Sequence, residues 1–104
     1  MKVMQRGIMK IMPGKMAEAM ELNEKYMAIV GRLGMPLNAM RMYRPFIGGL
    51  EYMHTVVFEV EWDDFTTMAT FFEKVMAEPE VQAMMPKWDA VLESHEVELY
   101  VPMS

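Results

Sequence analysis

The first third of the chain changes from a strand-like pattern to a helical one. Hydrophobic and polar residues alternate loosely over residues 2–12, which predicts a β-strand that Pro13 ends. From there the period becomes helical, and one apolar stripe runs through residues 16–33 with most charged side chains off it. Gly34 follows where a C-terminal glycine cap belongs. We therefore expect a strand followed by an amphipathic helix.

The middle of the chain is predicted to form two neighbouring strands. Residues 38–46 have the composition of a strand, and residues 51–62 are rich in Val, Phe, Tyr and Thr. Gly48 and Gly49 between them are typical of a hairpin turn. The two strands should therefore pair directly.

The last third begins with a helix and ends with a strand. Asp63 and Asp64 form a good N-cap pair, and the helical stripe that starts at Phe65 stops at Glu78 and Pro79. The prolines then predict short helices over 79–85 and 86–93, before a strand over 95–101.

The predicted order is therefore β-α-β-β-α-β, the ferredoxin-like motif of the α+β class. It implies a four-stranded antiparallel sheet with both main helices on one face. No repeat or linker interrupts the pattern, so residues 1–104 are expected to form a single domain.

The turn at Gly48 and Gly49 also predicts which strand residues share a face. A two-residue loop would place Tyr43 opposite His54 and Arg41 opposite Val56. The face so defined carries Arg41, Tyr43, Tyr52, His54, Val56, Phe58, Val60 and Trp62. The other face is rich in methionine and suits helix packing, which would leave large apolar side chains of the first face in water. We therefore expect this face to meet the same face of a second copy, giving a homodimeric eight-stranded α/β barrel.

The composition limits the kinds of partner that the chain is expected to bind. The chain of 104 residues carries a net charge of -5, which argues against nucleic acid and against an anionic membrane surface. It has no cysteine, no signal-like start and no apolar run long enough to span a membrane. These features predict a cytoplasmic protein without a metal or other cofactor. The 16 methionines are interpreted as core filler, or alternatively as an adaptable binding surface.

The whole chain resembles the dimeric α/β-barrel superfamily, and within it NIPSNAP-like and antibiotic-biosynthesis-monooxygenase-like proteins. The matching segments are Pro13-Gly14-Lys15, Tyr43-Arg44-Pro45-Phe46-Ile47-Gly48-Gly49, the aromatic strand end with its acidic cap, Ala77-Glu78-Pro79-Glu80-Val81 and Pro86-Lys87-Trp88. The resemblance implies the fold. It leaves the reaction open, because the superfamily includes cofactor-independent oxygenases, haem-handling enzymes and members with no known activity.

The candidate site lies on the predicted barrel face. His54 and Tyr43 are the candidate catalytic residues, since they could polarise a phenolic or enolic substrate or accept its proton. Arg41, Phe58 and Trp62 are the candidate ligand-binding residues. Alternatively, His54 and Tyr43 only pair with each other across the dimer core and have no catalytic role.

Other sites have weaker support. His95 is interpreted as a solvated strand start. Two histidines without cysteine do not form a zinc set, and no residue set matches the haem-degrading members.

Two functions remain open. The first is a small-molecule enzyme of the cofactor-independent monooxygenase type, acting on a small apolar or aromatic ligand in the barrel. The second is a non-catalytic, NIPSNAP-like dimeric binding module. A cavity of about 300 Å³ or more beside His54 would favour the enzyme, and a filled interior would favour the module.

Overall fold

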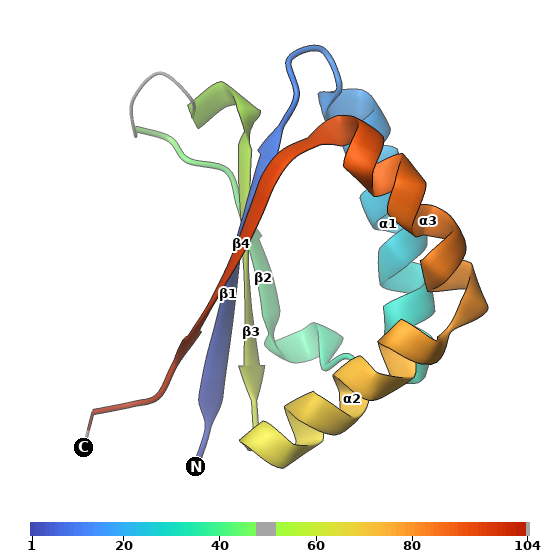
Figure 1. Ribbon diagram of the computed structural model, residues 1–104. Helices are drawn as coiled ribbons and strands as arrows, with labels where there is room; N and C mark the ends of the chain where they lie inside the picture. Colours follow the sequence, from blue (N-terminus) through green and yellow to red (C-terminus); the bar gives the residue numbers. More distant parts are fainter. Residues whose placement is uncertain (48–51, 104) are drawn as a thin grey trace.

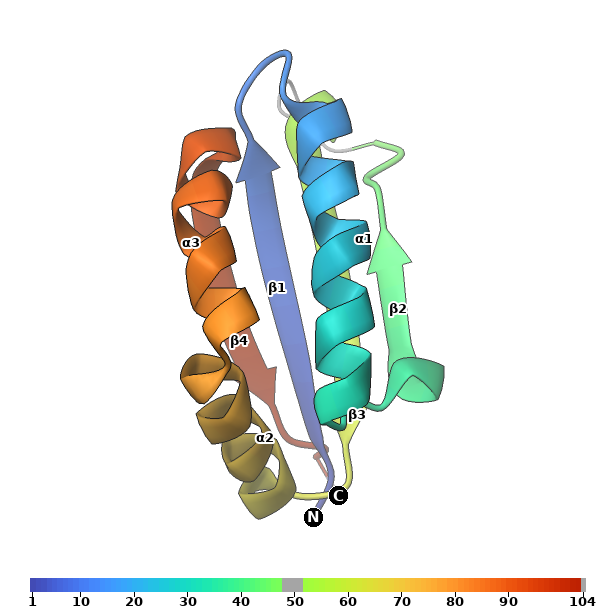
Figure 2. The ribbon, with the colours of Figure 1, turned by 90° about the vertical axis from the view of Figure 1, so that its right-hand side faces the viewer.

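The computed structural model describes residues 1–47 and 52–103 of the chain. Within them, four strands form one antiparallel sheet in the order β2-β3-β1-β4. All three α-helices lie on the same face of this sheet (Figures 1 and 2). The elements are β1 (Val3–Ile11), α1 (Met16–Leu33), η1 (Leu37–Ala39), β2 (Met40–Tyr43), η2 (Tyr52–His54), β3 (Thr55–Trp62), α2 (Phe65–Ala77), α3 (Pro79–Val91) and β4 (Leu92–Tyr100). The predicted ferredoxin-like α+β fold is confirmed.

Local signals fix most helix ends. Gly34 caps α1 with a left-handed φ of 113°, a conformation that costs other residues the steric clash of a Cβ. Asp64 caps α2, because its Oδ1 accepts a hydrogen bond from the Thr67 amide at 2.6 Å. Pro79 begins α3 in the first turn, where its missing N–H has no partner to lose.

One helix prediction is wrong. The expected short helices over 79–85 and 86–93 are a single helix, α3, with Pro86 inside it. Pro86 removes one backbone hydrogen bond, but the helix stays continuous because Val81, Met84 and Val91 on either side of it are buried. Strand β4 then starts at Leu92, the residue directly after α3.

The two faces of the sheet differ in what covers them. Along β1 every second residue is buried, and these buried residues face the helices. The core beneath the helices forms two neighbouring clusters. The first contains Val3, Ile29, Val30, Val60, Trp62, Met68, Phe71, Val75, Val81 and Met84. The second contains Met9, Ile11, Ala19, Val56 and Val91.

The predicted register between β2 and β3 is also wrong. The structure pairs Arg41 with Glu59 and Tyr43 with Val57, a shift of three residues from the expected partners. Because side chains alternate between the two faces along a strand, a register shift by an odd number of residues puts the residues of β2 on the opposite face from the β3 residues with which they were expected to share a face. Phe58 and Trp62 therefore face the helices, whereas Arg41 and Tyr43 face away from them. The Gly48-Gly49 turn on which the prediction relied lies outside the described residues.

Candidate functional site

A cavity of about 360 Å³ lies between the sheet and the helices. We call it the central cavity. Its walls come from all four strands, all three α-helices and the segment after α1, and most of its surface is apolar. It is lined by Gln5, Met9, Asn23, Tyr26, Met27, Met35, Met40, Met42, Phe58, Phe72, Met85, Trp88, Asp89, Leu92, His95 and Val97. Its volume is in the range of small-molecule sites.

A glycine in β1 shapes the floor of the cavity. Gly7 pairs with Phe58, and the Phe58 ring occupies the space that a Cβ on Gly7 would need. The ring therefore lies flat across β1 and reaches toward β4, where its centroid is 6.0 Å from that of the His95 ring. Any larger residue at position 7 would push Phe58 out of this place.

His95 is the titratable ring at the open side of the cavity. It pairs with Met9 across the sheet and so shares the buried side of β1, although its own side chain is exposed. Partial burial lowers the pKa of His95 below its usual 6.5, because desolvation disfavours the imidazolium. His95 makes no hydrogen bond to another described residue, so its neutral ring offers one donor and one acceptor to a ligand.

Further polar groups are held in place by the wall itself. Gln5 Oε1 accepts a hydrogen bond from Trp62 Nε1 at 3.0 Å, which leaves the amide nitrogen of Gln5 as the donor of this side chain. Asn23 Nδ2 donates to Met42 Sδ at 3.4 Å and so connects α1 with β2.

On the helical side, the Tyr26 ring packs edge-on against Trp88 with centroids 6.3 Å apart. Burial raises the pKa of Tyr26, so its hydroxyl stays protonated at neutral pH.

The charges of the lining limit the kind of ligand. Among the described residues that line the cavity, Asp89 is the one that carries a formal charge, and none is a lysine or an arginine. A carboxylate or phosphate would therefore lose its hydration without gaining a cation. A neutral apolar molecule with a hydroxyl that can donate to His95 fits this lining better.

The structure separates the residues of the predicted site. Phe58 lines the central cavity, but Trp62 is only 2% exposed and reaches the cavity only through its bond to Gln5. Arg41 and Tyr43 lie on the opposite face, in a hollow of about 400 Å³. His54 ends the η2 turn before β3 and lines neither of these spaces. Catalytic roles for His54 and Tyr43 stay predictions.

His95 is the residue that sequence reasoning missed. The alternation of the last strand was the available signal. His95, Val97 and Leu99 are every second residue and so lie on one face, and Val97 and Leu99 are apolar. Those residues indicate that this side of the strand faces the helices, and the pairing of Gly7 with Val97 confirms it.

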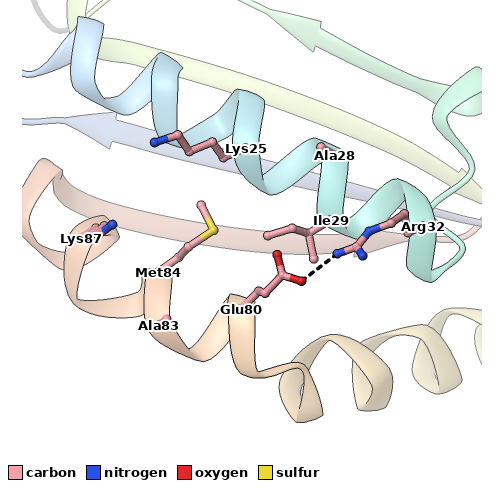
Figure 3. A pocket seen from close by; sticks show the side chains of 8 residues that line it. All are labelled: Lys25, Ala28, Ile29, Arg32, Glu80, Ala83, Met84 and Lys87. Carbon is pink, nitrogen blue, oxygen red and sulfur yellow. Dashed lines mark hydrogen bonds and ion pairs between the residues drawn. The ribbon is translucent and has the colours of Figure 1, made fainter.

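A further hollow, of about 560 Å³, lies on the outer surface between α1 and α3 (Figure 3). Ala28 and Ala83 contribute to it, and an ion pair between Arg32 and Glu80, 3.0 Å long, crosses one end. The described residues that line it include no histidine, aromatic ring or hydroxyl. It is a groove between packed helices and offers less chemistry than the central cavity.

Comparison with known proteins shows the fold. No protein-family model matches the sequence. No curated protein matches it either. Among solved structures, a NIPSNAP family protein from Agrobacterium tumefaciens superposes with a TM-score of 0.80 at 23% identity, over 98% of this chain and 86% of that one. A NIPSNAP domain protein from Burkholderia xenovorans gives 0.75 at 26% identity, over 100% and 96%.

SnoaB, a cofactor-independent oxygenase from Streptomyces nogalater, has the same fold. It superposes with a TM-score of 0.64 at 15% identity, over 99% of this chain and 94% of that one. The expected likeness to NIPSNAP-like and monooxygenase-like proteins is thus confirmed for the fold.

No helix in the described ranges is long and apolar enough to cross a membrane.

Proposed function

We propose that this chain binds a neutral, largely apolar phenol or enol in the central cavity and oxidises it with molecular oxygen, as a cofactor-independent monooxygenase. The observation that carries the proposal is the apolar cavity of about 360 Å³ with an unbonded, neutral His95 at its open side. SnoaB, an oxygenase of this class, has the same fold.

The chemistry needs few protein groups. His95 accepts the proton of the substrate hydroxyl, and the electron-rich anion then reacts with oxygen. One oxygen atom forms a new carbonyl on the ring, and the other leaves as water with two hydrogen atoms from the substrate. The substrate supplies all the electrons, and the apolar walls reduce the contact of the intermediate with solvent.

A second candidate function is a NIPSNAP-like binding module, kept because the NIPSNAP structures superpose with higher TM-scores than SnoaB does. In this alternative the cavity binds the same class of ligand without reacting. The two functions share the site and differ only in turnover.

The test is a panel of naphthols and hydroxyanthracenes, with naphthalene carboxylates of equal size as controls. We expect the phenols to shift the NMR signals of Phe58, Trp88 and His95, and the carboxylates to bind at least about tenfold more weakly. Turnover is measured by oxygen uptake and by incorporation of one ¹⁸O atom from ¹⁸O₂, with an anaerobic control.

The variants separate binding from chemistry. His95→Asn should lower the turnover rate more than it lowers affinity, whereas Met42→Ala should change affinity first. Phenol binding without oxygen uptake would favour the NIPSNAP-like alternative. If no member of the panel binds, or if the shifts map to the hollow around Tyr43, the central cavity is not the site.

A further inference from the structure

The helices cover the inner strands of the sheet more completely than the edge strand β4. On β1, Val3 and Met9 face the helices and are only 5% and 6% exposed. On β4, Val97 and Leu99 lie on the same side of the sheet, because Leu99 pairs with the buried Gln5, yet they are 51% and 49% exposed. Large apolar side chains are therefore left uncovered along the C-terminal half of β4.

A hollow of about 760 Å³ lies over this part of the strand, between β4 and α2. Figure 2 shows α2 beside the C-terminal end of β4. We call this space the edge hollow. It is lined by Phe65, Met68, Ala69, Phe72, Glu73, Met76, Ala77 and Leu99. Phe65 and Met76 are both more than half exposed, so the edge hollow is an apolar patch open to solvent.

The edge hollow continues the central cavity along β4. Phe72 of α2 lines both spaces, and its ring packs against Trp62 with centroids 6.2 Å apart. On β4, His95 and Val97 line the cavity and Leu99 lines the hollow. These three are alternate residues of the strand and lie on one side of it. The two spaces therefore follow one another, starting from the open side of the cavity at His95.

The lining of the edge hollow suits a hydrocarbon chain. Among the described residues that line it, Glu73 is the one with a formal charge, and none carries a cation or a hydroxyl. A strongly polar or anionic occupant would lose its hydration there without gaining a partner. Met68 and Met76 lie in the wall, and methionine side chains adapt to apolar occupants of irregular shape.

The described C-terminal residues of the chain itself do not cover the edge hollow. Val101 and Met103 follow β4 and are exposed. Figure 1 shows this segment turning away from the helices. The argument for an occupant is therefore the continuity of the hollow with the central cavity.

We propose that the ligand of the central cavity is a phenol that carries a hydrocarbon chain, and that this chain lies in the edge hollow. The inference rests on the proposed function, because the phenol ring occupies the central cavity with its hydroxyl at His95. The chain leaves by the open side of the cavity and passes between Val97 and Phe72. It ends against Leu99 and Met76.

The length of the chain follows from the strand. His95 and Leu99 are four residues apart, which is about 13 Å along a strand. An extended decyl chain is close to that length. Burial of the chain supplies affinity at a distance from the hydroxyl, and such remote binding energy can hold the ring in a reactive position.

A series of alkylated naphthols tests the chain. The alkyl group is placed on the ring remote from the hydroxyl and is lengthened from ethyl to tetradecyl. Calorimetric titration below the micelle concentration should show affinity that rises about twofold per methylene, because full burial is worth about fourfold and the hollow covers one side of the chain. The gain should stop near the decyl compound, where the chain reaches the end of the hollow.

Variants of the edge hollow separate the chain from the ring. Leu99→Thr and Met76→Gln should each weaken the decyl naphthol at least about fivefold and change the affinity of unsubstituted naphthol by less than about twofold. Met103→Gln makes the same change at an exposed position outside the hollow and is the matched control. With ¹³C-labelled methionine methyl groups, the decyl compound should shift the signals of Met68 and Met76, whereas naphthol should not. Circular dichroism checks that each variant is folded.

The outcomes distinguish this inference from the proposed function. Naphthol binding whose affinity does not depend on chain length would overturn the inference and leave the proposed function in place. Chain-dependent affinity without oxygen uptake would support the inference and count against the proposed reaction. If no naphthol binds, with or without a chain, both are wrong. A Met76 signal that shifts on dilution without ligand would show that a second copy fills the hollow, which would also overturn the inference.

Discussion

The two faces of the sheet are built from the same four strands but have different surroundings. The face toward the helices is apolar and surrounds a cavity, so its polar groups are few and are held by specific contacts such as Trp62 to Gln5. The open face, on the side away from the helices, mixes apolar residues with the charged side chains of Arg6, Arg41, Glu59 and Glu98, which are neighbours across the strands. Adjacent residues of one strand therefore experience different environments. The comparison shows that the effect of a substitution depends more on the face of the sheet to which the side chain points than on how far along the strand it lies.

The largest expected effect is at Val60, which is fully buried on the helix side, beside Glu61 on the open face. Val60→Glu buries an unpaired charge and should lower the free energy of unfolding by about 4 kcal/mol or more, enough to unfold a marginal domain. Glu61→Val, one residue away, should leave the chain folded. Urea denaturation followed by circular dichroism compares the two, and similar losses would show that the faces are not distinct.

A smaller effect is expected at Gly7. Gly7→Ala brings a methyl group into the place of the Phe58 ring and should cost about 1–3 kcal/mol. It should also reduce ligand binding, because the displaced ring moves into the cavity. Phe58→Leu in the same chain should recover part of the stability, and a double-mutant cycle measures the coupling. Additive losses would mean that the two residues do not interact.

The smallest effect concerns the pH dependence of His95. In the folded chain its pKa is lowered, so the unfolded state takes up a proton first as the pH falls. Stability should therefore be constant above the ordinary imidazole pKa of 6.5 and should decline as the pH falls below it toward the folded pKa. His95→Asn should reduce this decline. NMR titration of the His95 ring checks the direction, and a midpoint above 6.5 would contradict it.

Local patterns predicted the elements well, because caps and breakers act within a few residues. Gly34, Asp64 and Pro79 each fix a helix end through contacts to their immediate neighbours. The β-α-β-β-α-β order then determined the topology. Pro86 is the exception, since tertiary burial on both sides of it overrides its local preference.

The site was harder to predict because it depends on register. Strand β2 ends at Tyr43 and β3 begins at Thr55, so the connection is much longer than a two-residue turn and does not set the pairing. The resulting odd shift moved Arg41 and Tyr43 to the open face and Phe58 to the cavity. Val97 and Leu99 were a local signal for the face of His95, but placing His95 at the cavity also needed the pairing of β4 with β1, which joins opposite ends of the sequence.

The absence of any linker between α3 and β4 has a mechanical consequence. Val91 ends the helix and Leu92 begins the strand, so the backbone passes from one to the other without a hinge. Trp88 and Asp89 on the helix and His95 on the strand all line the cavity. We expect a ligand that displaces α3 outward to move the start of β4 as well, up to the register shift between Leu92 and Ser94. The NMR signals of the His95 ring would then change with the size of the ligand.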